Sequence, residues 1–341
     1  MKFLAQLVFV IAWFAFSACG KSSPDNTNNT PPSNLTLSAL VSTDNSGNVS
    51  FTAAATNAVS YDFDFGNGVY QTVPSGVVTY KYTISGAYTV TVVAKSAGGQ
   101  TISKSTTFNV NYVPALIWAE EFDAPGTPNP AKWGYDIGAG GWGNNELEYY
   151  TNRLDNAVVS GGTLKIIAKA ESFGGSAYTS ARLLSKDKFS FKYGKIEARA
   201  KLPAGVGTWP AIWMLGNNIS TSGWPACGEV DIMEHRGSEL NKIFATLHYP
   251  GHSGGNGVGN TVNITNATTE FHVYSMEWTS TSLKFYVDNQ LFHTMANSSN
   301  LPFNQNFFII LNVAMGGNFG GPVDPAFSSA AMEIDYIRVY Q

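Results

Sequence analysis

The stretch CGEVDIMEHRG, residues 227–237, carries three acidic side chains: Glu229, Asp231 and Glu234. Alternate residues of a β-strand point to the same face, so Glu229 and Asp231 would share one face of a strand here. A strict period of two then places Met233, and not Glu234, beside them. The third acid arrives one residue too late for a regular strand.

A β-bulge resolves this mismatch. One extra residue at Ile232 and Met233 would shift the alternation by one position and return Glu234 to the face of Glu229 and Asp231. The sequence therefore predicts a bulged strand that presents all three carboxyl groups on one face.

Three acids on one strand face repel one another, which favours a chemical role. Side chains along one face repeat at roughly 6 to 7 Å. Retaining glycosidases need two carboxyl groups about 5 to 5.5 Å apart, whereas inverting ones need about 6.5 to 9.5 Å. Tilted inward, the outer two glutamates would reach the retaining distance, and Asp231 between them would raise the pKa of a neighbour. A calcium site and a solvated acidic strand are the alternatives, but calcium ligands come mostly from loops.

Outward from this stretch, residues 115–341 contain many short strand-like segments separated by Gly, Asn and Pro, with no long helical periodicity. We expect an all-β fold in this region, a large antiparallel β-jelly-roll sandwich with a substrate cleft. Residues 34–112 alternate Val, Thr, Tyr and Phe between Gly and Asn turns, which predicts a smaller β-sandwich.

The amino-acid composition limits the class of ligand that the protein is expected to bind. Only 13% of the 341 residues are charged and another 13% are aromatic, and the net charge is −4. Such a surface suits neutral, hydroxyl-rich ligands and lacks the basic stripe of a nucleic-acid-binding protein, so we expect no nucleic-acid partner.

The N-terminus resembles an export signal. Residues 1–19 place one Lys before an apolar run that ends at Cys19, as in the lipobox of bacterial lipoproteins, although Phe16 replaces the usual aliphatic residue. We expect a lipid anchor on Cys19 and a location in the cell envelope or outer membrane; cleavage near Ala18 and secretion is the alternative. Residues 20–33 are polar and predict a disordered tether. Cys227 is then unpaired, and it is expected to be a small buried side chain, with a reactive thiol as the alternative.

Two family resemblances cover most of the chain. YDFDFGNG, residues 61–68, and the strand pair that follows it resemble the polycystic kidney disease (PKD) domain, for which a spacer role is expected. EVDIME resembles the signature of glycoside hydrolase family 16 in the form typical of laminarinases. The further blocks that resemble this family in order are GWGNNELEYYT (141–151), YGKIEARAKLP (193–203), TWPAIWML (208–215), TLHYPG (246–251), FHVYSMEW (271–278), LNVAMGGNFGG (311–321) and MEIDYIRVY (332–340).

The resemblance implies roles for the acid row. Glu229 matches the catalytic nucleophile and Glu234 the general acid/base, with Asp231 assisting between them, in a retaining mechanism. It implies no cofactor for catalysis. His248 matches a histidine close to the acids, whereas without the motif a lone strand histidine is more often a core residue.

The resemblance also implies a set of residues that bind the sugar chain. Aromatic rings pack on the apolar faces of sugars while amides and acids bond the hydroxyl groups. Core packing is the alternative for each Trp, and a structural salt bridge for the arginine. Besides His248, the residues expected to bind substrate are Trp142, Asn145, Glu148, Arg182, Trp209 and Trp213.

A structural calcium ion is a further implication. Family members often hold one away from the active site with acids of the first and last strands, and Glu121 and Asp335 occupy those places in this sequence.

We therefore expect an exported monomer that cleaves β-1,3-glucosidic bonds inside laminarin-type glucans, held to a membrane by its lipid. Three alternatives stay open: action on mixed-linkage β-1,3-1,4-glucan, action on a marine galactan, and β-glucan binding without catalysis.

Overall fold

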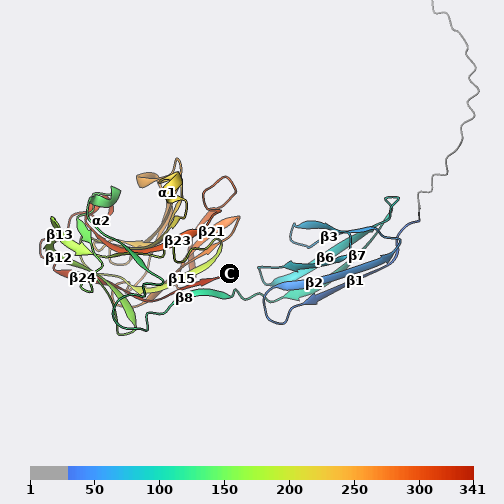
Figure 1. Ribbon diagram of the computed structural model, residues 1–341, viewed down its shortest axis with the longest axis horizontal. Coiled ribbons are helices and arrows are strands. Elements are labelled where there is room, and N and C mark those ends of the chain that lie inside the picture. The colour runs from blue at the N-terminus through green and yellow to red at the C-terminus, as the bar shows by residue number, and fades with distance from the viewer. Residues whose placement is uncertain (1–29) are drawn as a thin grey trace, which may run out of the picture. The chain divides into compact units, whose positions relative to one another are not determined.

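The computed structural model describes residues 30–341, which divide into two compact units, one ending at Val113 and one beginning at Pro114 (Figure 1). The predicted export signal, the Cys19 predicted to carry a lipid, and residues 20–29 of the predicted tether lie outside the described residues. Residues 30–33 of the predicted tether are described, and the last of them, Ser33, begins strand β1.

The N-terminal unit contains two small antiparallel sheets, with strand orders β1-β2-β5 and β4-β3-β6-β7. Phe51, Phe63 and Phe65 form part of its own buried core, and the Tyr82 hydroxyl donates to the Phe65 carbonyl oxygen at 2.9 Å. The strands are β1 Ser33–Val41, β2 Asn48–Thr56, β3 Ser60–Asp64, β4 Tyr70–Val73, β5 Val77–Lys81, β6 Gly86–Lys95 and β7 Thr101–Val110.

The C-terminal unit is a sandwich of a ten-stranded and a seven-stranded sheet. Its strands are β8 Leu116–Glu120, β9 Gly134–Asp136, β10 Glu148–Tyr150, β11 Ala157–Ser160, β12 Thr163–Phe173, β13 Ser176–Ser180, β14 Arg182–Leu184, β15 Gly194–Lys201, β16 Thr208–Gly216, β17 Glu229–His235, β18 Lys242–His248, β19 Val258–Asn263, β20 His272–Trp278, β21 Ser282–Val287, β22 Gln290–Ala296, β23 Phe307–Met315 and β24 Ser329–Tyr340.

Helices in the described residues are single turns. They are η1 Gly141–Gly143, α1 Ile219–Ser222, η2 Gly254–Asn256 and α2 Gly317–Gly320. Within residues 30–341, none of them has the length and apolar character that crossing a membrane requires.

The seven-stranded sheet carries the acids and has the order β19-β18-β17-β16-β23-β14-β9. The ten-stranded sheet runs β10-β13-β12-β24-β15-β20-β21-β22, with β8 on β24 and β11 on β12. Figure 1 shows the two layers, with β23 in one and β15, β24 and β8 in the other. The predicted all-β class and jelly-roll sandwich are confirmed. One pairing departs from the antiparallel expectation, because β10 and β13 run parallel over three residue pairs.

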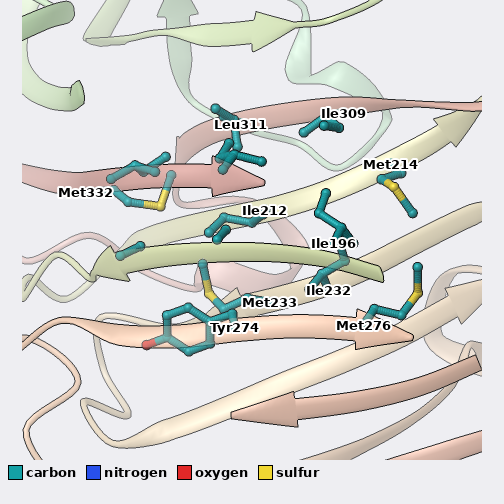
Figure 2. Close-up of a cluster of buried hydrophobic side chains, with 14 of the residues drawn as sticks. Ile196, Ile212, Met214, Ile232, Met233, Tyr274, Met276, Ile309, Leu311 and Met332 are labelled. Atoms are coloured by element: carbon teal, nitrogen blue, oxygen red, sulfur yellow. The ribbon is translucent and has the colours of Figure 1, made fainter. Parts of the chain in front are cut away.

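The large core lies between the two sheets and includes apolar side chains from both. Ile212 and Met214 of β16 and Ile309 and Leu311 of β23 contribute from the seven-stranded sheet, opposite Ile196 of β15 (Figure 2). These pairs are two residues apart, as the period of a strand requires. The intervening residues of β16 and β23 therefore point to the other face of the seven-stranded sheet, where the acids lie.

Candidate active site

A bulge in β17 sets the positions of the three acids. Against β18, Asp231 pairs with Thr246 and Glu234 with Phe244, so three steps along β17 match two along β18. Ile232 and Met233 are both buried in the core between the sheets, and Figure 2 labels both in that cluster. The predicted bulge is confirmed, and it places Glu229, Asp231 and Glu234 on the face turned away from the core.

Glu229 lies at the start of β17, opposite His248 of β18. The indole Nε1–H of Trp224 donates to its Oε2 at 2.9 Å, and His248 Nε2 lies 3.7 Å from its Oε1. The Glu229 side chain is 18% exposed, and Trp224 is 48% exposed. Glu229 is therefore held by an indole donor and is still reachable from solvent.

Glu234 is held by two donors of its own. Trp209 Nε1–H donates to Oε1 at 2.9 Å and the Thr246 hydroxyl donates to Oε2 at 3.3 Å. Both outer glutamates therefore receive an indole hydrogen bond, but from different segments: Trp209 belongs to β16 and Trp224 to the loop before β17.

Asp231 lies between them and is almost fully buried. Its Oδ2 has no hydrogen-bond partner among the described residues, and it lies 3.3 Å from His248 Nε2. A carboxyl group in this position is poorly solvated, so its neutral form is favoured.

Burial raises the pKa of all three acids. For Glu229, desolvation and then the charge of Asp231 raise the pKa to about 8, while His248 and the Trp224 hydrogen bond act in the opposite direction. Desolvation and then Glu234 raise the pKa of Asp231 well above its usual range. Desolvation also raises the pKa of Glu234, against the hydrogen bond from Trp209. The row therefore keeps its protons to higher pH than free carboxyl groups do, and a retained proton is what a general acid must supply.

Two predicted substrate-binding tryptophans enclose an arginine. The Arg182 guanidinium carbon lies 4.7 Å from the ring centroid of Trp213 and 5.2 Å from that of Trp142. Arg182 Nε also lies 3.0 Å from Asp136 Oδ2, so the salt bridge considered for this arginine is present. Trp142 adopts φ 47°, a left-handed backbone that is rare outside glycine, between Gly141 and Gly143. The three side chains form one partly exposed stack beside the acids.

Trp213 is fixed further by a chain of hydrogen bonds. Its Nε1–H donates to Asn312 Oδ1 at 2.7 Å, Asn312 donates to the Tyr150 hydroxyl at 3.0 Å, and Tyr150 donates to Glu146 Oε2 at 3.0 Å. These three partners lie under the stack and were not predicted from the sequence.

Asn145 and Glu148 have different surroundings. Asn145 is exposed and its amide donates to Asn318 Oδ1 at 2.8 Å. Glu148 is fully buried, its Oε2 accepts the Met315 backbone N–H at 2.6 Å, and burial raises its pKa well above the usual range. The prediction that Glu148 contacts substrate is therefore wrong for this arrangement, because alternation through β10 turns its side chain into the protein.

The predicted calcium ligands do not form a cation site. Arg338 binds Glu121 through both guanidinium Nε and Nη2 at 2.8 Å, and Arg199 forms an ion pair with Asp335. The guanidinium group on each carboxylate supplies the positive charge that a calcium ion would supply. The predicted calcium ligands Glu121 and Asp335 therefore belong to two separate ion pairs.

Cys227 is buried and unpaired in the described part of the chain. It packs with Leu184, Leu215, Phe308 and Ile310 in a small second cluster. Burial raises its pKa to about 11, so the expected small buried side chain, and not the reactive thiol, describes it.

Two glutamates on one face of a β-sandwich, each held by an indole donor among aromatic rings, fit the active site of a glycoside hydrolase. The family model for glycosyl hydrolases family 16 matches residues 144–338, more than half of the chain, and the model for the PKD domain matches residues 27–110. This chain belongs to glycosyl hydrolases family 16.

Similar proteins are named as glucanases. A beta-glucanase of Rhodothermus marinus is 44% identical over 242 residues, covering 66% of this chain and 85% of that protein. A glucan endo-1,3-beta-glucosidase of Cryptopygus antarcticus is 37% identical over 248 residues, covering 65% of this chain and 90% of that protein. The solved structure of a laminarinase from Rhodothermus marinus superposes with a TM-score of 0.65 at 44% identity, over 67% of this chain and 98% of the other.

Proposed function

We propose that this protein is a retaining endo-1,3-β-glucanase that acts on laminarin-type β-glucans. The observation that supports this most is the bulge of β17, which gathers Glu229, Asp231 and Glu234 on one face beside partly exposed aromatic rings. Family membership and the glucanase relatives support the same reaction and substrate class.

In the first step, a Glu229 carboxylate oxygen attacks the anomeric carbon while Glu234 gives its proton to the leaving glycosidic oxygen. The bond from the anomeric carbon to that oxygen breaks, and a covalent glycosyl ester forms on Glu229. In the second step, Glu234 removes a proton from water, the water oxygen attacks the same carbon, and the ester breaks. Each step inverts the configuration of the anomeric carbon, so the two steps together retain it. The side-chain carboxyl groups and water are the only reacting groups besides the sugar.

The donors around the acids fit these roles. Burial raises the pKa of both glutamates, so Glu234 can keep the proton that the leaving oxygen needs. At Glu229 the hydrogen bond from Trp224 N–H acts against burial and favours the ionised form that attacks. Asp231 lies between the two glutamates, and its charge helps to raise the pKa of Glu229. The stack of Trp142, Arg182 and Trp213 offers ring faces to sugars.

A polysaccharide panel tests the substrate. Laminarin, mixed-linkage β-1,3-1,4-glucan, agarose and carrageenan are compared by release of reducing ends. We expect laminarin to be cleaved to oligosaccharides and Glu229→Gln to abolish cleavage. Preferred cleavage of the mixed-linkage glucan or a galactan would redirect the assignment, and binding of laminarin without cleavage by the intact protein would remove it.

Azide rescue tests the two glutamate roles separately. Glu229→Ala with azide and a glucoside bearing a good leaving group is expected to give the α-glycosyl azide, because azide replaces the missing nucleophile. Glu234→Ala is expected to give the β-glycosyl azide, since azide attacks the glycosyl ester in place of water. The opposite stereochemistry in the two variants would exchange the assignments.

The proposal extends to location. We propose that residues 1–19 direct export, that Cys19 carries a lipid, and that a monomer acts from the cell envelope; the apolar run that ends at Cys19 supports this. Labelled fatty acid is expected to appear in the protein and to be absent from Cys19→Ser. Labelling of Cys19→Ser, or release of the unmodified protein into the medium, would refute the anchor.

A further inference from the structure

Glu229 and Asp231 of the acid row form, together with His248, a group of three possible metal ligands. One donor atom from each lies within 4.8 Å of the others. His248 Nε2 is 3.3 Å from Asp231 Oδ2 and 3.7 Å from Glu229 Oε1. The three side chains come from two adjacent antiparallel strands, β17 and β18, whose register places Glu229 directly opposite His248.

These separations resemble those of a zinc site. Zn²⁺ binds nitrogen and oxygen donors at about 2.0–2.2 Å in a tetrahedron, which separates the donors from one another by roughly 3.3–3.6 Å. The two measured separations from the imidazole nitrogen lie at or close to this range. The third separation, between the carboxylate oxygens of Glu229 and Asp231, is at most 4.8 Å, and the Glu229 side chain, which is 18% exposed, has to move to close this edge.

One donor already lacks a partner. Asp231 is about 3% exposed, and its Oδ2 has no hydrogen-bond partner in residues 30–341 although it points at His248 Nε2. A buried oxygen without a partner is costly, and a cation would satisfy it. The unpartnered Asp231 oxygen therefore points to a bound ligand independently of the clustering of the acids.

We propose that Glu229, Asp231 and His248 form a Zn²⁺ site in which the fourth position faces solvent, and that zinc bound there blocks hydrolysis. An imidazole nitrogen with two carboxylates selects zinc over Ca²⁺ and Mg²⁺, which prefer oxygen donors alone. Two carboxylates also neutralise the ion. The inhibition of hydrolysis by zinc rests on the proposed function, because zinc occupies the Glu229 lone pair that would attack the sugar. The binding of zinc does not depend on that function.

The test measures zinc binding and inhibition on the full chain. The protein is cleared of metal with EDTA, dialysed, and titrated with ZnCl2 by calorimetry and by thermal unfolding. We expect one ion per chain and a higher unfolding temperature, because a ligand that binds only the folded state stabilises it. With laminarin, zinc is expected to lower kcat, because Glu229 with zinc bound cannot attack a bound sugar; EDTA is expected to reverse this, and equal MgCl2 is expected to have no effect.

His248→Gln removes the nitrogen donor, and His252→Gln is the matched control, since His252 is an exposed histidine four residues further along the chain. We expect His248→Gln to bind zinc at least about tenfold more weakly, and His252→Gln to bind it as the unchanged protein does. If His248→Gln does not fold, Asp231→Asn serves as the second variant, with the same loss expected.

The outcomes separate the two proposals. Hydrolysis of laminarin without zinc binding, or zinc binding that His248→Gln leaves unchanged, would overturn the zinc site and keep the enzyme. Zinc binding that depends on His248 in a protein that cleaves no glucan would keep the site and overturn the function.

Discussion

At the scale of single residues, the hydrogen bond from Trp224 to Glu229 is the contact on which the proposed nucleophile depends most. It is an indole donor on a carboxylate of low solvent access, a type of bond that is stronger than one between neutral groups. Its donor comes from a loop, and so it can be removed without disturbing a strand.

Trp224→Phe keeps an aromatic ring and removes this donor. We expect kcat/KM on laminarin to fall roughly tenfold to a hundredfold, since hydrogen bonds to charged groups contribute about 1.5–3 kcal/mol. The midpoint of thermal unfolding is expected to stay nearly unchanged because Trp224 is 48% exposed. Unchanged kinetics would contradict the role of this bond.

Asp231→Asn tests the charge within the row. The charge of Asp231 raises the pKa of Glu229, so its removal lowers that pKa and leaves Glu229 ionised at lower pH. We expect the acidic limb of the pH profile of kcat/KM to move to lower pH, together with a lower maximum. A limb that stays in place or moves to higher pH would show that Asp231 does not act through its charge.

His235 gives a test of stability against pH. It is fully buried at the end of β17, and desolvation lowers its pKa to about 4. The unfolded chain, with a pKa near 6.5, binds more protons below that value, so the contribution of His235 to the free energy of unfolding falls as pH falls. Between pH 7 and pH 5 the loss is about 2 kcal/mol. Denaturant unfolding of His235→Leu is expected to lack this part of the pH dependence, and His252→Leu to keep it.

At the scale of elements, the bulge decides which side chains of β17 meet solvent. If the same sequence formed a regular strand without the bulge, the part of the strand after Asp231 would turn over, and Glu234 would point into the core while His235 left it. The core on that side is apolar and dense, so a carboxyl group placed there would have no partner.

Deleting Met233 tests the bulge directly, because the shortened stretch EVDIE alternates strictly and keeps Glu229, Asp231 and Glu234 on one face without a bulge. We expect the variant to keep measurable hydrolysis and to unfold at a lower temperature, since a buried side chain is lost. Met233→Leu conserves volume and residue count, and it is expected to cost less than about 1.5 kcal/mol and to stay active. Activity and circular dichroism of the two variants check this, and a folded deletion variant without activity would show that the bulge does more than align the acids.

Sequence reasoning predicted the elements better than it predicted contacts between them. The period of two, broken once, was enough to locate the bulge, because alternation is a local property of the chain. Trp224 was missed because its hydrogen bond depends on the path of the loop before β17, which no period describes. Glu121 and Arg338 are 217 residues apart, so their ion pair, which corrects the calcium prediction, follows only from the register of β8 and β24.

Glu148 shows the same limit within a short element. The surrounding Gly and Asn residues indicate an exposed loop, and Asn145 is indeed exposed. Glu148 begins a strand of three residues, too short for alternation to reveal which side faces inward. Its inward direction follows from its contact with the backbone N–H of Met315, which lies 167 residues further along the chain.

At the scale of the whole molecule, each unit has a core of its own. A unit with its own core can fold alone. All three acids, their donors and the aromatic stack belong to residues 114–341.

The segment 114–341, produced alone, is therefore expected to keep the kcat of the longer protein on soluble laminarin, within about twofold, and to show a single cooperative unfolding transition. A large fall in kcat would mean that the N-terminal unit contributes to catalysis. Initial rates and thermal unfolding of the two forms give the comparison.

The buried thiol of Cys227 has a practical consequence for following the motions of this enzyme. In a form that begins after Cys19 it is the sole cysteine, and it lies two positions before Glu229. A thiol reagent reaches Cys227 only when the surrounding structure opens. The labelling rate in native buffer therefore reports how often the segment before β17 opens locally. The protein thus contains a native reporter of local opening next to its proposed nucleophile, and bound oligosaccharide should slow that reporter.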